Sequence, residues 1–478
     1  MIKIHFCLPF FKMENTRLLK LLRTFSKSEL QGLKKFVRTP FFNQRSEVPA
    51  LLDWLSVSLK SERLVSDKAA AFRQIFGKTA YDDHRIRMAM SFLYQLSGQY
   101  LVLQSFLENQ VVYRKELAAV FRLRNLPDQS EKACAEAGAL QQQSPLRNAD
   151  FLEEKYQILL EKHRFQVDTQ QVNQQDLQEL SDQLDHAFLA RKLWQACVML
   201  SHQNVSNATY QFGLLEAALA HAEQTGALEI PAVAIYYHCY QALVHPAESA
   251  HFRQFRQLLT QCGEQFPAEE LRDLYILAIN FCIRQYNAGN QAYLPEQFEL
   301  YKEGLNRKYF LSDGAISRYT YQNAATIGLV MHELEWVESL IHEYRPLLKE
   351  EHREGLFSFN LARLEYHRRN LGKALQLLQK AEYKDLLLNL AAKILQLKIF
   401  YELQEFDLLA SHLQAIRSFI RRKKVMGYHR ENYMNTVHFT QKLLEVNLFD
   451  KNIKTTLRQE IEATKAVAEK EWLLEQLK

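Results

Sequence analysis

Residues 356–390, LFSFNLARLEYHRRNLGKALQLLQKAEYKDLLLNL, decide the fold that we expect for this chain. Apolar side chains recur every three or four positions on both sides of Arg369-Asn370, which is the spacing of one face of an α-helix. Two antiparallel helices joined by so short a break form an α-hairpin. The stretch therefore predicts one α-hairpin with its turn at Arg369-Asn370.

The same apolar pattern occurs 35 residues upstream and 35 residues downstream of this stretch. A single α-hairpin cannot bury its own apolar face, so recurring hairpins are expected to stack on one another. We expect the aligned residues to be equivalent, and Trp336, Leu371 and Phe406 to be buried. The aligned positions are Tyr321/Leu356/Ala391, Ala324/Phe359/Ile394, Ile327/Ala362/Leu397, Leu329/Leu364/Ile399, Met331/Tyr366/Tyr401, Trp336/Leu371/Phe406 and Leu340/Leu375/Ala410.

Residues 320–425 resemble the tetratricopeptide repeat (TPR) family, because one α-hairpin per ~34 residues is typical of that family. RNLGKAL (369–375) and QEFDLLA (404–410) are similar to its turn between helices, and Ala362, Ala374 and Ala381 stand at its small-residue positions. The third repeat departs from the pattern with Leu397, Leu409 and Ile416 there. The resemblance implies a right-handed solenoid whose first helices line a concave groove.

Two shorter phrases, ELYKEGLNRKYFL and EKEWLLEQL, resemble a group of uncharacterised bacterial helical-repeat proteins. This second resemblance implies no particular activity.

The composition favours an all-α protein. Only 14 Gly and 10 Pro occur in 478 residues, far below the usual ~7% and ~5% that turn-rich β proteins need. The length exceeds the ~250–300 residues at which a single core stops growing. We expect a helical N-terminal domain (1–125), a polar Gln-rich helical connection (126–178), TPR-like repeats (179–425) and C-terminal capping helices (426–478).

Helix signals set the expected elements. Ser26 and Glu29 form a capping box, and Ser66-Asp67 and Asp82-Asp83 are expected to begin helices. In the repeat region, the expected helix pairs are 187–203 with 208–224, 230–244 with 247–262, and 269–286 with 292–306.

The start of the chain and the cysteines suggest the location. The apolar run near Met1 is too short for a secretory signal, and Met13 opens a clearer helical pattern, which leaves Met1 and Met13 as alternative starts. No window approaches 18 apolar residues, so no membrane span is expected. Six cysteines without C-x-x-C spacing are typical of small buried side chains in a reducing cytoplasm.

No catalytic, cofactor-binding or metal-binding residue is expected. His332-Glu333 and His342-Glu343 begin like the zinc motif H-E-x-x-H, but Trp336 and Pro346 stand where the second ligand is needed. The looser group His238, Cys239, His245 and His251 lacks a nearby carboxylate or second thiolate. Phosphate-binding loops and nucleophile elbows are also absent from the sequence.

The charge pattern leaves two classes of function open. With 60 basic and 55 acidic residues the chain lacks the strong basic excess of a dedicated nucleic-acid binder. We therefore expect a non-catalytic scaffold that binds a protein or peptide. The alternative is a nucleic-acid-associated regulator whose N-terminal helices contact DNA through Lys34, Lys35 and Arg38. The basic run 417–430 is read either as a phosphate grip or as a helix C-terminus that complements the helix dipole.

The TPR resemblance implies the binding surface. It places Phe359 with Ile394, Tyr366 with Tyr401, and Arg363 with Lys398 in three groove rows, with His332 and His367 at the edge. Asn360 is the single match to the family's carboxylate clamp, and the clamp's ligand is therefore not implied. Such a groove suits a partly apolar, acidic helix or peptide. In the alternative reading, the aromatic residues pack between repeats, or the C-terminal helix ending in EKEWLLEQL folds over them.

Overall fold

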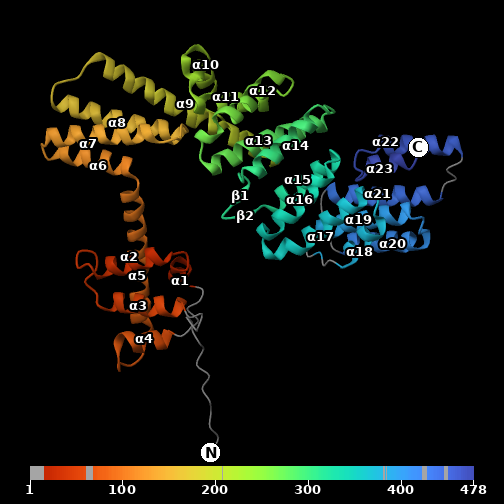
Figure 1. Cartoon of the computed structure of the whole chain (residues 1–478), viewed down its shortest axis with the longest axis horizontal. Coiled ribbons are helices and arrows are strands. Elements are labelled where there is room, and N and C mark those ends of the chain that lie inside the picture. Colours follow the sequence, from red (N-terminus) through yellow and green to blue (C-terminus); the bar gives the residue numbers. More distant parts are fainter. Residues whose placement is uncertain are drawn as a thin grey trace, which may run out of the picture. The chain divides into compact units, whose positions relative to one another are not determined.

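The computed structural model describes residues 16–60, 68–206, 208–380, 383, 385–422, 428–445 and 450–478. Over these residues the chain forms 23 α-helices, three 3₁₀ turns and one two-stranded sheet (Figure 1). The prediction of an all-α protein is confirmed. The small sheet pairs β1 (Leu311–Ser312) with β2 (Ala315–Ile316), and the Asp313-Gly314 turn between them has positive φ at both residues. Asp-Gly is typical of such tight hairpin turns.

The chain divides into two compact units, residues 1–145 with 149–187, and residues 146–148 with 188–478. The boundary near residue 187 lies inside one helix, α9 (Gln174–Val205). Residues 126–145 and 149–178, from the expected Gln-rich helical connection, belong to the first unit. Their helices α7 (Pro127–Gln143) and α8 (Ala149–Asp168) pack on α6 (Gln110–Leu123).

The N-terminal part of the first unit is a small helical bundle. Ser26 Oγ accepts a hydrogen bond from Glu29 N at 3.2 Å, and Glu29 Oε2 accepts one from Ser26 N at 2.6 Å, so the predicted capping box is present. Asp82 caps the long fifth helix, whereas the cap predicted at Ser66-Asp67 lies outside the described residues. The helices are α1 (Arg17–Leu22), α2 (Lys27–Arg38), α3 (Glu47–Lys60), α4 (Lys68–Phe76) and α5 (Asp83–Glu108). Their apolar faces share one core that includes Leu19, Leu33, Leu51, Leu55 and Leu93.

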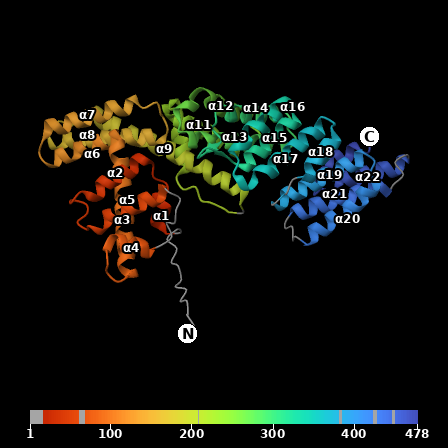
Figure 2. The same ribbon diagram turned by 60° about the horizontal axis from the view of Figure 1, so that its bottom comes forward.

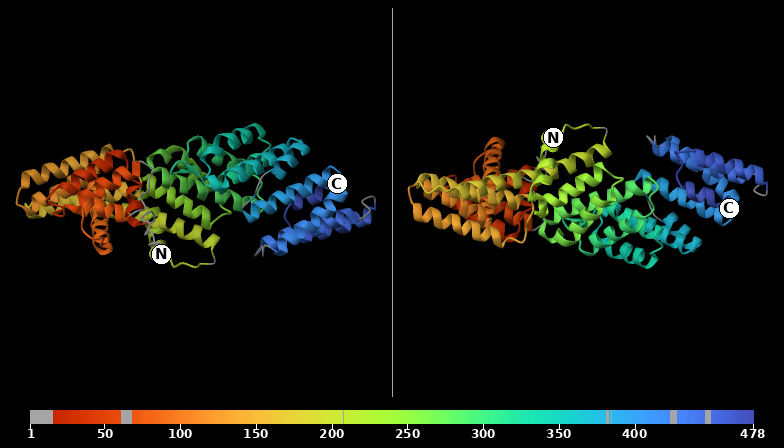
Figure 3. Two further views of the ribbon diagram at one scale, coloured as in Figure 1. Left: turned by 90° about the horizontal axis from the view of Figure 1, so that it is seen from below. Right: turned by 90° about the horizontal axis from the view of Figure 1, so that it is seen from above.

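The second unit consists mainly of consecutive α-hairpins. Figures 2 and 3 show the hairpins one beside the next in chain order, from green to blue. The first helices pack on one another in the pairs α11 with α13, α15 with α17, and α17 with α19. The hairpins are α11 (Pro231–Val244) with α12 (Ser249–Cys262), α13 (Ala268–Asn287) with α14 (Tyr293–Asn306), α15 (Arg318–Val330) with α16 (Leu334–Tyr344), α17 (Glu350–His367) with α18 (Leu371–Lys380), and α19 (Leu386–Glu402) with α20 (Phe406–Arg422).

The remaining elements of the second unit lie before and after these hairpins. The helix pair expected at 187–203 and 208–224 differs in the structure, where α9 continues to Val205 and α10 spans only Leu215–Gln224. At the other end the chain finishes with α21 (Tyr428–Glu445), α22 (Lys451–Ala463) and α23 (Lys470–Glu475). The 3₁₀ turns are η1 (Gly226–Glu229), η2 (Gly263–Gln265) and η3 (Arg345–Leu347).

The turns within three hairpins fix the repeat register. His332, Arg369 and Gln404 have φ of 58°, 64° and 60°, and the next N–H in each case bonds back to the end of the first helix. These are αL caps of one kind, so the three residues are structurally equivalent. The step from Arg369 to Gln404 is 35 residues, as predicted, but the step from His332 to Arg369 is 37. The two extra residues lie between Leu334 and His367, a segment that contains the 3₁₀ turn η3.

This shift corrects the expected set Trp336, Leu371 and Phe406. Trp336 lies two positions further into its helix than the other two, and Phe406 is 49% exposed, so the prediction of three equivalent buried residues is wrong. Leu371 and Phe406 begin their helices and therefore lie at the hairpin edge. The fully buried equivalents are Val337, Ala374 and Leu409, followed one turn later by Ile341, Leu378 and Leu413.

Two of the three predicted small-residue positions are also buried. Ala362 and Ala374 are fully enclosed between helices, and Ala381 lies outside the described residues. Over the described ranges, no helix is both long enough and apolar enough to cross a membrane.

Candidate functional site

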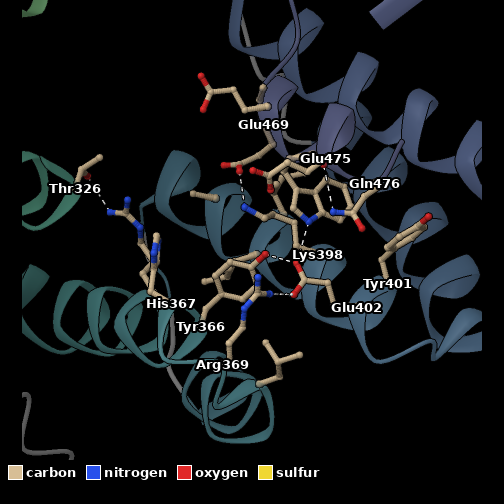
Figure 4. A pocket seen from close by; sticks show the side chains of 18 of the residues that line it. Thr326, Tyr366, His367, Arg369, Lys398, Tyr401, Glu402, Glu469, Glu475 and Gln476 are labelled. Carbon is tan, nitrogen blue, oxygen red and sulfur yellow. Dashed lines mark hydrogen bonds and ion pairs between the residues drawn. The ribbon is translucent and has the colours of Figure 1, made fainter. Parts of the chain in front are cut away.

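The second unit contains a groove of about 1260 Å³ between three consecutive first helices and the C-terminal segment (Figure 4). One face each of α15, α17 and α19 lines the groove, and residues from Ala468 to Gln476 line it from the opposite side. It is therefore formed by consecutive hairpins together with a segment that is distant in sequence.

Seven of the eight predicted site residues line this groove, namely Phe359, Arg363, Tyr366, His367, Ile394, Lys398 and Tyr401. Phe359, Arg363 and Tyr366 are spaced by four and three residues, which places them on one face of α17. His332 also lines the groove. The sequence pattern thus identified side chains that the fold brings together, although their binding role stays a prediction.

Asn360 is the exception. It is fully buried, and neither atom of its side-chain amide has a hydrogen-bond partner. Each helical residue turns the side chain by about 100°, so Asn360 points away from Phe359 and lies on the buried face with Leu356 and Leu364. Its predicted place in the groove is corrected.

One row of polar residues crosses the groove. Thr326, Arg363 and Lys398 occupy equivalent positions in the three hairpins, separated by the same steps of 37 and 35 residues as the helix turns. Arg363 Nη1 donates a hydrogen bond to Thr326 Oγ1 at 2.8 Å, and its guanidinium lies 5.7 Å from the centre of the Phe359 ring. A hydroxyl, rather than a carboxylate, is therefore the hydrogen-bond partner of this cation.

Lys398, unlike Arg363, has an ion pair. Its Nζ lies 2.6 Å from Glu469 Oε2 and 4.9 Å from the centre of the Tyr366 ring. Within the described residues Arg363 forms no ion pair. Exclusion of water by the surrounding protein lowers the pKa of the Arg363 guanidinium from its usual value, and the nearby Glu469 charge opposes this shift.

Glu402 joins the floor of the groove to the C-terminal helix. Its carboxylate accepts hydrogen bonds from the Tyr366 hydroxyl, from Trp472 Nε1 at 2.9 Å and from Arg369 Nη1 at 2.9 Å. Figure 4 shows Tyr366 and Arg369 pointing toward this carboxylate from the neighbouring helix. Burial and the adjacent Glu402 raise the pKa of Tyr366 well above its usual range, so this phenol stays protonated.

The C-terminal segment forms a wall of the groove. The Trp472 ring meets the Tyr401 ring edge to face, with centres 5.5 Å apart. Trp472, Leu473 and Leu477 are buried in a core shared with α20, α21 and α22. The alternative in which the C-terminal helix folds over the aromatic residues is therefore realised for Tyr401, whereas Thr326 and His367 lie away from Glu475 and Gln476 in Figure 4.

The loop before α23 is also held firmly. Asn435 Nδ2 donates to the Ala466 carbonyl at 2.8 Å, and the Thr436 hydroxyl donates to the Ala468 carbonyl at 2.5 Å. Burying one large apolar side chain contributes about 1.5–3 kcal/mol, so moving α23 would cost several times that amount. We therefore regard this segment as a fixed wall.

His367 lies among positive charges on the side of the groove next to α15. The surrounding protein and, in decreasing order, the charges of Arg363, Lys398, His332 and Arg369 lower its pKa to about 4. The His332 and His367 rings approach edge to face, with centres 6.4 Å apart. This histidine is therefore neutral near pH 7.

Comparison with protein-family models, curated proteins and solved structures finds no match for the chain. The chemistry of the groove is therefore the basis for any functional conclusion.

Sequence reasoning left out several groove residues, among them Thr326, Arg369 and Glu402, and placed the segment with Glu469 and Trp472 over the groove only in the alternative interpretation. Glu402 follows Lys398 by four positions, so helical spacing could have placed it on the same face. To identify Thr326 as the equivalent of Arg363 would have required the correct repeat register, with a step of 37 residues. No local signal connects Glu469 and Trp472, about 70 positions away, with the groove.

Two other groups of residues from the sequence analysis, the histidines around His238 and the basic run 417–430, form no comparable groove among the described residues. Nδ1 of His238 lies 3.2 Å from Nδ1 of His251, and burial lowers the pKa of His238. Within the described ranges, no three His, Cys, Asp or Glu side chains are arranged to hold a metal ion. In the basic run, α20 ends at Arg422 and residues 423–427 lie outside the described part.

The cysteines of the described residues are all free. Cys197, Cys239 and Cys282 are buried and Cys134 and Cys262 are half-buried, whereas Cys7 lies outside the described residues. Burial raises the pKa of Cys134 to about 11, which makes it a poor nucleophile.

Proposed function

We propose that this chain is a non-catalytic scaffold that binds a protein or peptide in the groove lined by α15, α17 and α19. In this proposal the hairpins of the second unit stack as a TPR-like, right-handed solenoid, and the protein acts in the cytoplasm. The packing of α15 on α17 and of α17 on α19 supports the stacking. Solenoids use such grooves as extended binding surfaces.

The observation that carries the proposal is the Arg363 guanidinium. A cation that protein atoms surround is usually paired, because an unpaired one costs free energy. Arg363 has a hydroxyl partner and, in the described part of the chain, no carboxylate within ion-pair distance. Such a residue is explained if a bound partner supplies the missing negative charge.

The size and lining of the groove favour a peptide over a small metabolite. Small-molecule pockets usually enclose ~300–1,000 Å³, and this groove is larger at about 1260 Å³. Phe359, Ile394, Tyr366 and Tyr401 supply apolar surface beside Arg363. A segment with apolar side chains and at least one acidic side chain fits this combination.

The alternative of a nucleic-acid-associated regulator has less support. Lys34 Nζ and Arg38 Nη2 lie 3.2 Å and 2.5 Å from the two carboxylate oxygens of Asp53. This carboxylate partly neutralises the basic surface on which a DNA contact would depend. Weak, salt-independent retention on heparin would agree with the preferred proposal.

A peptide selection tests the proposal. The full chain is exposed to a random linear-peptide display library, and the enriched peptides are measured against Arg363→Glu. We expect about tenfold or greater loss of affinity, since a favourable contact becomes a repulsive one. Arg253→Glu is the matched control, because Arg253 is exposed on α12 outside the groove, and it should bind as the wild type does.

Two results would overturn the proposal. One is that no peptide is enriched over a selection without the protein. The other is that a correctly folded Arg363→Glu variant, judged by its helical circular dichroism, binds the enriched peptides with unchanged affinity.

A further inference from the structure

The groove concentrates charge around one neutral side chain, His367. The charged and titratable groups near it come from every element that forms this part of the groove. They are His332 after α15, Arg363, Tyr366 and Arg369 on or after α17, Lys398 and Glu402 on α19, and Glu469 before α23.

Most of these charges are already balanced within the protein. Glu402 neutralises Arg369 at 2.9 Å, and Glu469 neutralises Lys398 at 2.6 Å. Arg363 forms no ion pair with any described residue, so the ion pairs nearest His367 leave one positive charge in excess, whereas the further carboxylates Glu471 and Glu475 line the groove from α23. A single monoanion would balance it.

The site is also accessible from one side. The C-terminal wall covers Lys398 and Tyr401 through Glu469 and Trp472. Thr326 and His367 lie on the other side of the close-up in Figure 4, away from Glu475 and Gln476, and His367 remains exposed to solvent. A ligand group can therefore reach Arg363 and His367 without moving the wall.

We propose that Arg363, with Thr326, His332 and His367, forms a subsite for one carboxylate side chain of the groove's ligand, and that His367 takes up a proton when this carboxylate binds. Arg363 provides the charge, and the imidazole groups provide hydrogen-bond donors. The Thr326 hydroxyl donates to the Gln322 carbonyl at 2.8 Å and accepts from Arg363, so its part is to orient the guanidinium. This inference rests on the proposed function, because it assigns the acidic residue of the proposed peptide to a place in the groove.

The link between carboxylate binding and proton uptake by His367 follows from electrostatics. In the free protein the surrounding cations repel a proton on His367 and hold its pKa at about 4. A bound carboxylate cancels the charge of Arg363 and attracts an imidazolium, so the pKa of His367 must rise in the complex. By linkage, binding then becomes tighter as the pH falls from 7, and it weakens again only where the ligand carboxylate itself becomes protonated, near pH ~4.

The test uses formate, the smallest carboxylate, and needs no identified ligand. The full chain carries isotope-labelled histidine, and the His367 signal is identified by its loss in His367→Gln. Nuclear magnetic resonance then follows its titration in sodium formate and in sodium chloride at equal ionic strength. We expect formate to shift the His367 titration toward higher pH in the wild-type protein.

Two variants make the result specific. In Arg363→Met, loss of the cation should raise the pKa of His367 in chloride, and formate should cause no further shift. Arg369→Met is the matched control, because Arg369 is already paired with Glu402, and it should keep the formate effect.

Titrations of His367 that coincide in formate and chloride would overturn this inference, as would a formate shift that persists in Arg363→Met. Neither result would change the expected outcome of the peptide selection, because apolar contacts could still hold a peptide in the groove. Conversely, failure of the selection with a normal formate response would overturn the proposed function and leave only an anion subsite.

Discussion

Arg363 Nη1 donates a hydrogen bond of 2.8 Å to Thr326 Oγ1, a residue at the equivalent position of the preceding hairpin. Elsewhere in the same unit Arg256 has the opposite environment. Its guanidinium lies 2.7 Å from Glu296 and 2.5 Å from Glu303. Arg256 thus has two carboxylate partners, whereas Arg363 has none among the described residues.

This comparison predicts opposite effects on stability. Arg256→Met should lower the free energy of unfolding by about 1.5–3 kcal/mol, because it leaves two partly exposed carboxylates without their cation. Arg363→Met should leave stability unchanged or slightly higher, because it removes an uncompensated charge and keeps the apolar contacts of the side chain. Urea unfolding measures both, and a loss for Arg363→Met as large as that for Arg256→Met would refute the prediction.

The close packing of α15 on α16 requires a residue without a side chain at Gly328. A Cβ on Gly328 would lie 2.5 Å from Val337 Cγ2 and 2.9 Å from Trp336 Cε3. Gly328→Ala should therefore cost about 1–3 kcal/mol of stability through overpacking. Gly372→Ala is the control, because no atom lies within 4 Å of the added Cβ, and it should be neutral or stabilising by about 0.4–1 kcal/mol. Equal losses in thermal unfolding would contradict this difference.

The corrected repeat register predicts that Leu409, rather than Phe406, is the residue of α20 that contributes most to the stability of its hairpin. Leu409 is fully buried, whereas the larger Phe406 is 49% exposed. Leu409→Ala should cost about 2–5 kcal/mol. Phe406→Ala should cost about 1 kcal/mol or less, although it removes more atoms. A larger loss for Phe406→Ala in chemical unfolding would restore the original register.

Histidines with lowered pKa values predict a loss of stability in acid. Partial burial lowers the pKa of His238 and His412, and the surrounding protein together with neighbouring cations lowers that of the exposed His367 to about 4. Between this value and the unfolded pKa of about 6.5, the unfolded state binds more protons. Stability should therefore decrease as pH falls through this window.

His367→Gln tests one part of this effect. The variant should lose less stability than the wild type between pH ~6.5 and ~4, by an amount reduced because solvent screens this exposed side chain. Urea unfolding at several pH values measures the difference. Identical pH dependence of the two proteins would show that His367 does not contribute.

The sequence by itself determined the class of the fold and much of the groove. Scarce Gly and Pro and the three-and-four spacing of apolar residues predicted helices, because these features reflect local backbone preferences. The same spacing put Phe359, Arg363 and Tyr366 on one face of α17 and Ile394, Lys398 and Tyr401 on one face of α19. It could also have excluded Asn360, which lies about 100° from Phe359 around the helix.

Only the tertiary structure decided the register between the first two of these hairpins and the far wall of the groove. The two extra residues near η3 are invisible to a periodic pattern, because connections between helices can absorb changes in length, and they moved Thr326 opposite Arg363. The pairing of Lys398 with Glu469 and of Glu402 with Trp472 joins positions about 70 residues apart. Such contacts depend on how the chain returns through space, for which local propensity and periodicity carry no information.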